Sequence, residues 1–396
     1  MDKKRSSFTL YPQLQDILLL CLTTVGTTLL LWLPFILHIP LNNLPKELFT
    51  FDTILKHWDG LLYVIVAKTW YDPMNPILQS APLGLSPIYF AAHQPLYPIT
   101  IAMLTKLLSY PYAMLVSTLI ASCGLATIFY LLVTHLKLSK RPLLLTLCLM
   151  LLIPRFVLVR SVGSSEPLFM LLILLSVWMV AEKHFFWAAL AGMFAIMTRT
   201  PAALLGIAYA IIALLEWYQT KKINWQWGWI LLMPLGLLGV FYWYGLQYQD
   251  VLAYFHSGDN LHLTHPLAVF NHSERWVGTA WLEDVAIYFI LFAMTLIWRW
   301  ETVQMKIADL GTKDRFEMIS TIFMFVYISA TIMLDHRDIP RYSLPMIPFV
   351  LLTFESFFTS KKFQWVLILA LPIIYFYALN MLTYNIAPIT DWRPFL

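Results

Sequence analysis

A carboxylate flanked by aromatic side chains follows the first long apolar segment of the chain, in the run HWDGLLY at 57–63. A charged group costs about 2.5–3.5 kcal/mol at the centre of a membrane-spanning helix, so Asp59 is expected to face protein, water or a substrate. As a general base it could take the proton of an acceptor hydroxyl while that oxygen attacks a sugar carbon. Trp58 and Tyr63 could stack on the sugar or lie at the level of the lipid headgroups. An interfacial loop in which Asp59 caps a helix explains the same pattern.

Two arginines four residues apart, Arg337 and Arg341, lie in the run DHRDIPRY at 335–342. Planar guanidinium groups suit phosphate oxygens, so this run could hold a phosphate and stabilise it as a leaving group. His336 and Tyr342 would lie beside it as substrate contacts. A solvated turn closed by Asp–Arg pairs within the run is the alternative. One short acidic run without a second ligand cluster rarely forms a metal site, so no metal is predicted.

Four further polar residues lie at or between apolar runs: His93, Arg155, Glu166 and Arg199. Arg155 falls inside an apolar run, where an arginine is a functional candidate by default. Glu166 and Arg199 lie in turns that neighbouring helices would bring close, so they could form a structural ion pair or contact a substrate. His93 could contact a substrate or cap the helix that follows it.

The composition says which elements must position these residues. The chain has 396 residues, of which 60% are hydrophobic and only 12% are charged, with a mean hydropathy of +0.70. Soluble domains carry about 25% charged residues. Apolar runs near 20 residues then predict an all-α polytopic membrane protein, with residues 1–396 forming one domain. The three cysteines lie in apolar runs and are expected to pack as small hydrophobic side chains.

Basic residues between the apolar runs predict the orientation, because cytoplasmic loops are rich in Lys and Arg. The N-terminus is predicted inside and the C-terminus outside. The outer segments would be a long first loop at 40–112 with short interfacial helices at 44–55 and 60–70, a second loop at 249–284, and the basic loop at 335–342. About eleven spans are predicted, at 16–38, 113–134, 142–160, 167–181, 185–198, 202–217, 227–246, 284–298, 318–334, 343–358 and 364–383.

The run at 57–63, Glu166, Arg199 and the run at 335–342 all fall on the outer side of this topology. So do all the histidines except His135 and His184. A site on the extracytoplasmic or lumenal face of a plasma membrane or an ER-type membrane is therefore predicted.

Five short motifs carry a family resemblance: WDGLLYVIVA at 58–67, HQPLYP at 93–98, SEPLF at 165–169, TRTP at 198–201 and PRY at 340–342. With one span before a long outer loop, the chain resembles the GT-C class of polyprenol-phosphate-sugar-dependent glycosyltransferases. It is most similar to the mannosyltransferases that add the second mannose to GPI anchors, and to their prokaryotic relatives. The likeness covers most of the chain in pattern, and its most specific parts span about 40 residues.

The resemblance implies a GT-C-like fold and an inverting transfer of a mannose-like sugar from a dolichyl or polyprenyl phosphate to a lipid-linked or glycan acceptor. Neither nucleotide, metal nor nucleic acid would take part. Asp59 would be the catalytic residue, and Arg341 and more loosely Arg199 would face the donor. The chain departs from the paired acidic motif of many GT-C enzymes, since the acidic residues nearest to Asp59 are Asp52 and Asp72.

Two other classes of protein remain open. A lipid-linked-sugar flippase would also need charges and aromatic surfaces in the membrane, but transporters tend to show internal repeats and polar residues at the midplane. This chain shows no repeat between its halves, and its polar residues gather on one face. A non-catalytic subunit of a glycosylation complex is the other alternative. No Gly-rich phosphate loop is present, which disfavours a nucleotide-sugar donor. The sugar and the acceptor are not specified by the sequence.

Overall fold

The computed structural model describes residues 10–41, 44–80, 82–258, 263–270, 279–335 and 338–387; the side chains of 10–12, 58, 59, 82, 279–282 and 308 also lie outside the described part. The described residues form helices and no strand, with two isolated β-bridges. Five of these helices are long and apolar enough to cross a membrane: Gln13–Ile36, Tyr110–His135, Thr200–Thr220, Trp225–Tyr248 and Lys361–Tyr384. The predicted class, an all-α membrane protein, is therefore supported.

The helices fall into three groups along the chain. The first group is α1 (Leu10–Ile36), η1 (Lys46–Leu48), α2 (Phe51–Leu55), α3 (Trp58–Thr69), α4 (Pro76–Gln79), η2 (Pro82–Gly84), η3 (Pro87–Ala92), α5 (Leu96–Leu104) and α6 (Tyr110–His135). The second is α7 (Pro142–Leu151), α8 (Pro154–Val159), α9 (Glu166–Ala181), α10 (Phe185–Thr198), η4 (Thr200–Ala202), α11 (Ala203–Thr220), η5 (Trp225–Leu231), α12 (Leu232–Tyr248) and α13 (Ala253–His256). The third is η6 (Ala268–Phe270), α14 (Thr279–Trp298), α15 (Trp300–Gln304), η7 (Ile307–Asp309), α16 (Thr312–Thr331), α17 (Ile339–Tyr342), η8 (Leu344–Met346), α18 (Ile347–Thr353), α19 (Glu355–Phe358) and α20 (Lys361–Tyr384).

Two predicted spans are not continuous helices. The span at 142–160 ends as α7 and resumes as α8 at Pro154, because proline lacks an N–H and keeps the preceding Ile153 extended, at φ −90° and ψ 108°. The span at 343–358 is divided into η8, α18 and α19, with Pro345 and Pro348 each near the start of a piece. The prediction of one continuous helix in each region is therefore wrong.

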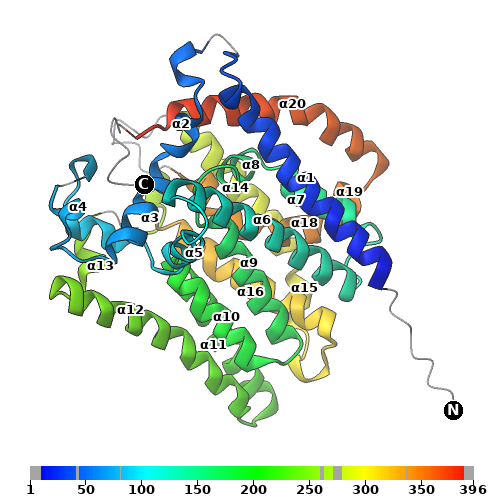
Figure 1. Cartoon of the computed structure of the whole chain (residues 1–396). Helices are drawn as coiled ribbons and strands as arrows, with labels where there is room; N and C mark the ends of the chain where they lie inside the picture. The colour runs from blue at the N-terminus through cyan, green and yellow to red at the C-terminus, as the bar shows by residue number, and fades with distance from the viewer. Residues whose placement is uncertain are drawn as a thin grey trace.

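The first predicted outer loop contains the expected short helices. Residues 44–55 hold η1 and α2, and residues 60–70 lie in α3. A further short helix, α5, covers Leu96–Leu104, and α6 already begins at Tyr110, two residues before the predicted end of the loop. In Figure 1, α2, α3, α4 and α13 gather at one end of the bundle, while α15 and α19 lie at the other.

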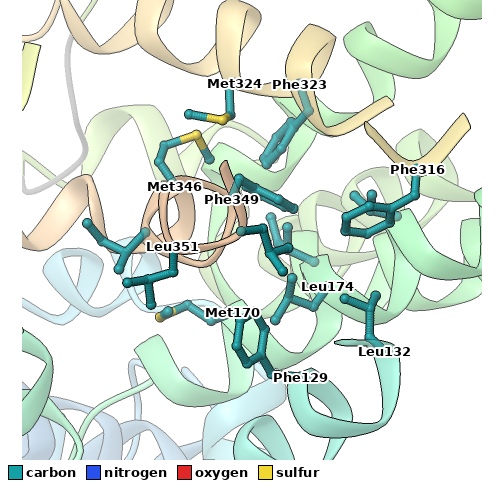
Figure 2. Packing of buried hydrophobic residues seen from close by; sticks show 14 of the residues in the cluster. Phe129, Leu132, Met170, Leu174, Phe316, Phe323, Met324, Met346, Phe349 and Leu351 are labelled. Atoms are coloured by element: carbon teal, nitrogen blue, oxygen red, sulfur yellow. The ribbon is translucent and has the colours of Figure 1, made fainter. Parts of the chain in front are cut away.

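The core lies where α6 packs between α1 and α9, with α16 and α18 behind α9. Figure 2 shows Phe349 of α18 between Phe323 of α16 on one side and Met170 of α9 on the other; the rings of Phe323 and Phe349 lie 6.1 Å apart in an edge-to-face contact. This packing holds α9, whose first residue is Glu166.

Candidate functional site

The N-terminal end of α3 lies directly against the turn at 161–165. A Cβ atom added to Gly60 would lie 2.9 Å from the Gly163 Cα atom and 2.6 Å from the Met114 sulfur. The two backbones thus touch without side chains between them, which only glycine allows at this distance. The backbone of Asp59 lies in the first turn of α3, beside this contact, and the side chains of Trp58 and Asp59 lie outside the described part.

The same turn is fixed from behind by the HQPLYP motif. The backbone N–H of Ser164 donates to the hydroxyl oxygens of both Tyr97 and Thr118, at 3.0 Å each. The Tyr97 and Thr118 hydroxyls also bond to each other, at 2.6 Å. Because buried polar groups need partners, this network holds the turn in one conformation.

A buried ion cluster lies next to the turn and joins three distant parts of the chain. Glu166 begins α9, and its Oε1 atom accepts hydrogen bonds from Arg199 Nη1, at 2.5 Å, and from Arg341 Nε. Its Oε2 atom accepts from the Ser164 hydroxyl. The Glu166 side chain is 3% exposed, and those of Arg199 and Arg341 are 15% and 16% exposed. One carboxylate therefore faces two guanidinium groups, which leaves the cluster with a net charge of +1.

Tyr63 connects this cluster to α3. Its hydroxyl lies 2.9 Å from the Ser165 hydroxyl, which also accepts from Arg199 at 3.4 Å. The Arg199 guanidinium lies 5.7 Å from the centre of the Tyr342 ring, within the range of a cation–π contact. The helix that carries Asp59 and the arginines from two other turns thus belong to one packed unit.

A second ion pair borders the cluster. Arg155 of α8 pairs with Asp338, and both side chains are largely buried. Arg341 pairs with Glu166, and Asp338 pairs with Arg155, so this part of the 335–342 run is buried rather than solvated. The alternative pair of Asp335 with Arg337 falls on Arg337, which lies outside the described residues. His336 and Arg337 of the same run lie outside the described residues.

A cavity of about 30 Å³ lies between the two ion pairs. A water molecule needs about 10–15 Å³ of such volume, so the cavity has room for water but not for a sugar phosphate. A substrate would have to displace some of the residues that line it. The cavity is lined by His57, Arg155, Leu158, Val159, Val162, Gly163, Ser164, Asp338, Arg341 and Asn385.

His93 lies one layer behind the ion cluster. Its ring makes an edge-to-face contact with Tyr63, with centroids 5.0 Å apart, and its backbone oxygen accepts from the Tyr71 hydroxyl at 2.7 Å. Burial raises the pKa of the Tyr71 phenol well above its ordinary value, so the phenol stays a neutral donor. The predicted alternative of a helix cap is not seen, because Pro95 occupies the cap position of α5 and no side chain caps that helix.

The structure therefore brings together five of the predicted site residues, namely Tyr63, Glu166, Arg199, Arg341 and Tyr342, with His93 behind them. Sequence reasoning missed Ser164, Ser165 and Gly163 of the connecting turn, although the run SVGSSEP at 161–167 was itself a signal of a tight polar turn. Among the described residues, no group of three His, Cys, Asp or Glu side chains is placed to hold a metal ion. Two guanidinium groups around one carboxylate form a site that can receive one further negative charge.

A comparison with models of known protein families finds no match for this chain, and a comparison with curated proteins finds no similar sequence. Its function is therefore inferred from the geometry of the site.

Proposed function

We propose that this protein is a GT-C-like glycosyltransferase of the membrane, which moves a mannose-like sugar from a polyprenyl or dolichyl phosphate to a hydroxyl of a lipid-linked or glycan acceptor. The observation that carries this proposal is the buried cluster of Glu166, Arg199 and Arg341, with its net charge of +1, packed through Tyr63 against the helix of Asp59. This transfer requires a cationic site that binds the donor phosphate, and a carboxylate base that faces the acceptor hydroxyl.

In the proposed reaction the donor phosphate binds Arg199 and Arg341, with Arg337 adding a further cation, while Glu166 holds the first two guanidiniums in position. Asp59 takes the proton of the acceptor hydroxyl. The bond between that oxygen and the sugar C1 forms as the bond from C1 to the phosphate oxygen breaks, and the phosphate leaves with the electron pair. Fixed cations beside the leaving group stabilise its developing charge. Attack opposite the leaving group inverts the configuration at C1.

The remaining candidates would contact the sugars. Tyr342 and Trp58 would supply aromatic faces for the sugars, and His93 and His336 would supply imidazole groups as hydrogen-bond partners. In this proposal the chain needs no metal cofactor and no nucleotide, since the phosphate of the donor already activates the sugar and the arginines balance its charge.

The topology that goes with this function has eleven spans, with the N-terminus inside, the C-terminus outside and Asp59 on the extracytoplasmic or lumenal face. Its support is the distribution of charge. The basic pair Lys361–Lys362 begins α20 next to α19, at the end of the bundle opposite α3 (Figure 1). Because basic residues favour the cytoplasmic side, this arrangement supports the proposed orientation, in which α3 lies on the outer side.

The test is sugar transfer by the purified protein in detergent, with radiolabelled mannose on a short-chain polyprenyl phosphate and a membrane lipid extract as acceptor. Asp59→Asn is expected to lose roughly 10²–10⁴-fold in rate, the usual contribution of a general base. The matched control is Asp52→Asn, which changes a carboxylate in α2 that pairs with Lys56 and is expected to leave the rate unchanged.

Transfer that survives EDTA and depends on Asp59 would support the proposal. Transfer by Asp59→Asn at the wild-type rate would refute the assignment of the base. Movement of the donor across liposome membranes, without transfer from any of a panel of lipid-linked sugars, would instead identify a flippase.

A further inference from the structure

A second, much larger cavity lies at the other end of α3. It has a volume of about 800 Å³ and is bounded by the C-terminal end of α3, by α5, and by α10 and α12. Its lining residues are Thr69, Trp70, Tyr71, Asp72, Pro95, Ile99, Met197, Gly236, Gly239, Val240, Trp243 and Gln247. None of them belongs to the ion cluster, so this groove is separate from the proposed donor-phosphate site.

The length of the groove matches one leaflet of a bilayer. Along α12 it extends from Gly236 to Gln247, which is about 16 Å at 1.5 Å per residue. The hydrocarbon core of a bilayer is about 30 Å thick, so the groove spans about half of it. Only 22% of the apolar window of η5 and α12 is buried inside the protein, so most of this span faces outward. Gly239 keeps the floor open, since an added Cβ would meet no atom within 4 Å.

One end of the groove is polar and carries a negative charge. Thr69, Asp72 and Gln247 gather there with two tryptophans, and Trp70 and Trp243 are each 39% exposed. Among the described residues that line the groove, Asp72 is the only charged one. A phosphate headgroup would face this carboxylate with no cation to balance it, whereas a hydroxyl group can donate to it. Tryptophan side chains are enriched at the interface between the hydrocarbon core and the lipid headgroups.

Contacts connect the polar end of the groove with the ion cluster. Tyr71 lines the groove and donates to the His93 backbone, and the His93 ring packs on Tyr63. Gln94, which lies between His93 and the groove residue Pro95, is 2% exposed, and both its amide atoms are without a hydrogen-bond partner among the described residues. A buried amide with a donor and an acceptor left over suits the hydroxyl groups of a sugar.

We propose that this groove binds one chain of a membrane lipid whose headgroup is uncharged and rich in hydroxyls, that is, a neutral glycolipid. The chain lies along Gly236 and Gly239, and the headgroup lies at Asp72 and Gln247. If the proposed function holds, this lipid is the acceptor. The donor and the acceptor then bind at different ends of α3, and their different charges direct them to different sites. The anionic donor goes to the arginines, and the neutral acceptor goes to Asp72.

The experiment measures lipid binding without any donor. The purified full chain in nanodiscs is exposed to glucosyl-diacylglycerol with a photoreactive diazirine in one acyl chain, and labelled peptides are identified by mass spectrometry. We expect labelling on 236–247 and in α5. Unlabelled glucosyl-diacylglycerol should compete at roughly tenfold or more lower concentration than phosphatidylglycerol, because only the latter brings a negative charge to Asp72.

Two variants test the assignment. Gly239→Leu fills the groove and should reduce labelling by at least about tenfold, since small changes of volume in an apolar site have effects of this size. Gly26→Leu in α1 is the matched control, because an added Cβ there also meets no atom within 4 Å. Asp72→Lys should reverse the preference, so that phosphatidylglycerol competes better than the glycolipid.

Labelling that is spread evenly over the lipid-facing helices and unchanged by Gly239→Leu would overturn the proposal. Equal competition by the two lipids in the wild type would do the same. Because binding is read without transfer, the two proposals fail separately. Specific labelling without sugar transfer would support the lipid groove and contradict the proposed transferase activity. Asp59-dependent transfer without specific labelling would support the transferase activity and contradict the lipid groove.

Discussion

Replacing Glu166 by glutamine should destabilise the protein strongly, although the side chain keeps its shape. Glu166 is 3% exposed and receives two guanidinium groups, from Arg199 and Arg341. The variant leaves both cations buried with no carboxylate between them, and the charge of the cluster rises from +1 to +2. The loss therefore comes from two uncompensated cations rather than from a cavity.

The magnitude follows from the two contacts. At 4 Å and an effective dielectric constant of 20, each attraction is worth about 4 kcal/mol before desolvation is counted. Removing one partner of a buried ion pair costs about 3–5 kcal/mol in practice. Because Glu166 serves two arginines, we expect the upper part of this range. At roughly 2 °C for each kcal/mol in a large domain, the melting temperature in detergent should fall by about 8–10 °C.

The assay is thermal unfolding of the purified variants, followed by loss of the monodisperse peak in gel filtration. The control is Glu216→Gln, whose carboxylate accepts from two neutral donors, Asn224 Nδ2 at 3.2 Å and Trp227 Nε1 at 2.5 Å. A hydrogen bond to a charged group is worth about 1.5–3 kcal/mol, and glutamine keeps one of the two acceptors, so this control should lose only about 3–6 °C.

A double variant separates charge from packing. In Glu166→Gln/Arg341→Gln one of the two unbalanced cations is gone, so the double variant should be about as stable as Glu166→Gln alone, or more stable. The coupling energy should lie in the usual range for contacting residues, about 0.5–3 kcal/mol. Losses that simply add, or a Glu166→Gln variant that melts with the wild type, would show that the cluster does not act as one electrostatic unit.

Two further changes test how α3 and α8 are held in place. Gly60→Ala should lower the unfolding free energy by about 1–3 kcal/mol, because the new methyl group meets the backbone of Gly163 at 2.9 Å. The control Gly26→Ala places its methyl group in open space and should be neutral or slightly stabilising. Equal melting temperatures for the two variants would contradict the close contact. Arg160→Lys should lower the melting temperature, because the buried guanidinium donates to several acceptors at once, including Thr28 Oγ1 at 2.7 Å. An ammonium group cannot reach all of these acceptors. A lysine variant with the wild-type melting temperature would refute this.

Much of the helical architecture could be predicted from the sequence, because apolar runs and prolines are local signals. The positions of α1, α6, α9 and α20 follow from uninterrupted apolar runs. The breaks in the predicted spans at 142–160 and 343–358 were marked by prolines, but a proline can kink a helix as well as end it. Which of the two happens depends on the neighbouring helices, and a single sequence does not contain that information.

The candidate site was predictable in its members but not in its pairing. The Glu166–Arg199 pair joins neighbouring turns, and helix order alone raised it as an alternative. Arg341 lies 175 residues from Glu166, and nothing local indicates that contact. The pairing of Asp338 with Arg155 was hidden for the same reason. The approach of Gly60 to Gly163 also depends on how two distant segments pack, although each glycine is next to a polar residue, Asp59 or Ser164.

The bridge between His57 and Ile386 can form only late in synthesis of the chain, because its two partners lie far apart in the sequence. The Ala387 N–H donates to the Lys56 oxygen at 2.8 Å, directly before α3, and Asn385 lines the small cavity at the ion pairs. Residues 57 and 386 are separated by 386 − 57 = 329 positions. At about 5–20 residues per second, the ribosome needs roughly 15–65 s to make the second partner after the first. Until residue 387 has been made, the segment directly before α3 therefore lacks this backbone partner, and the small cavity lacks Asn385 from its lining.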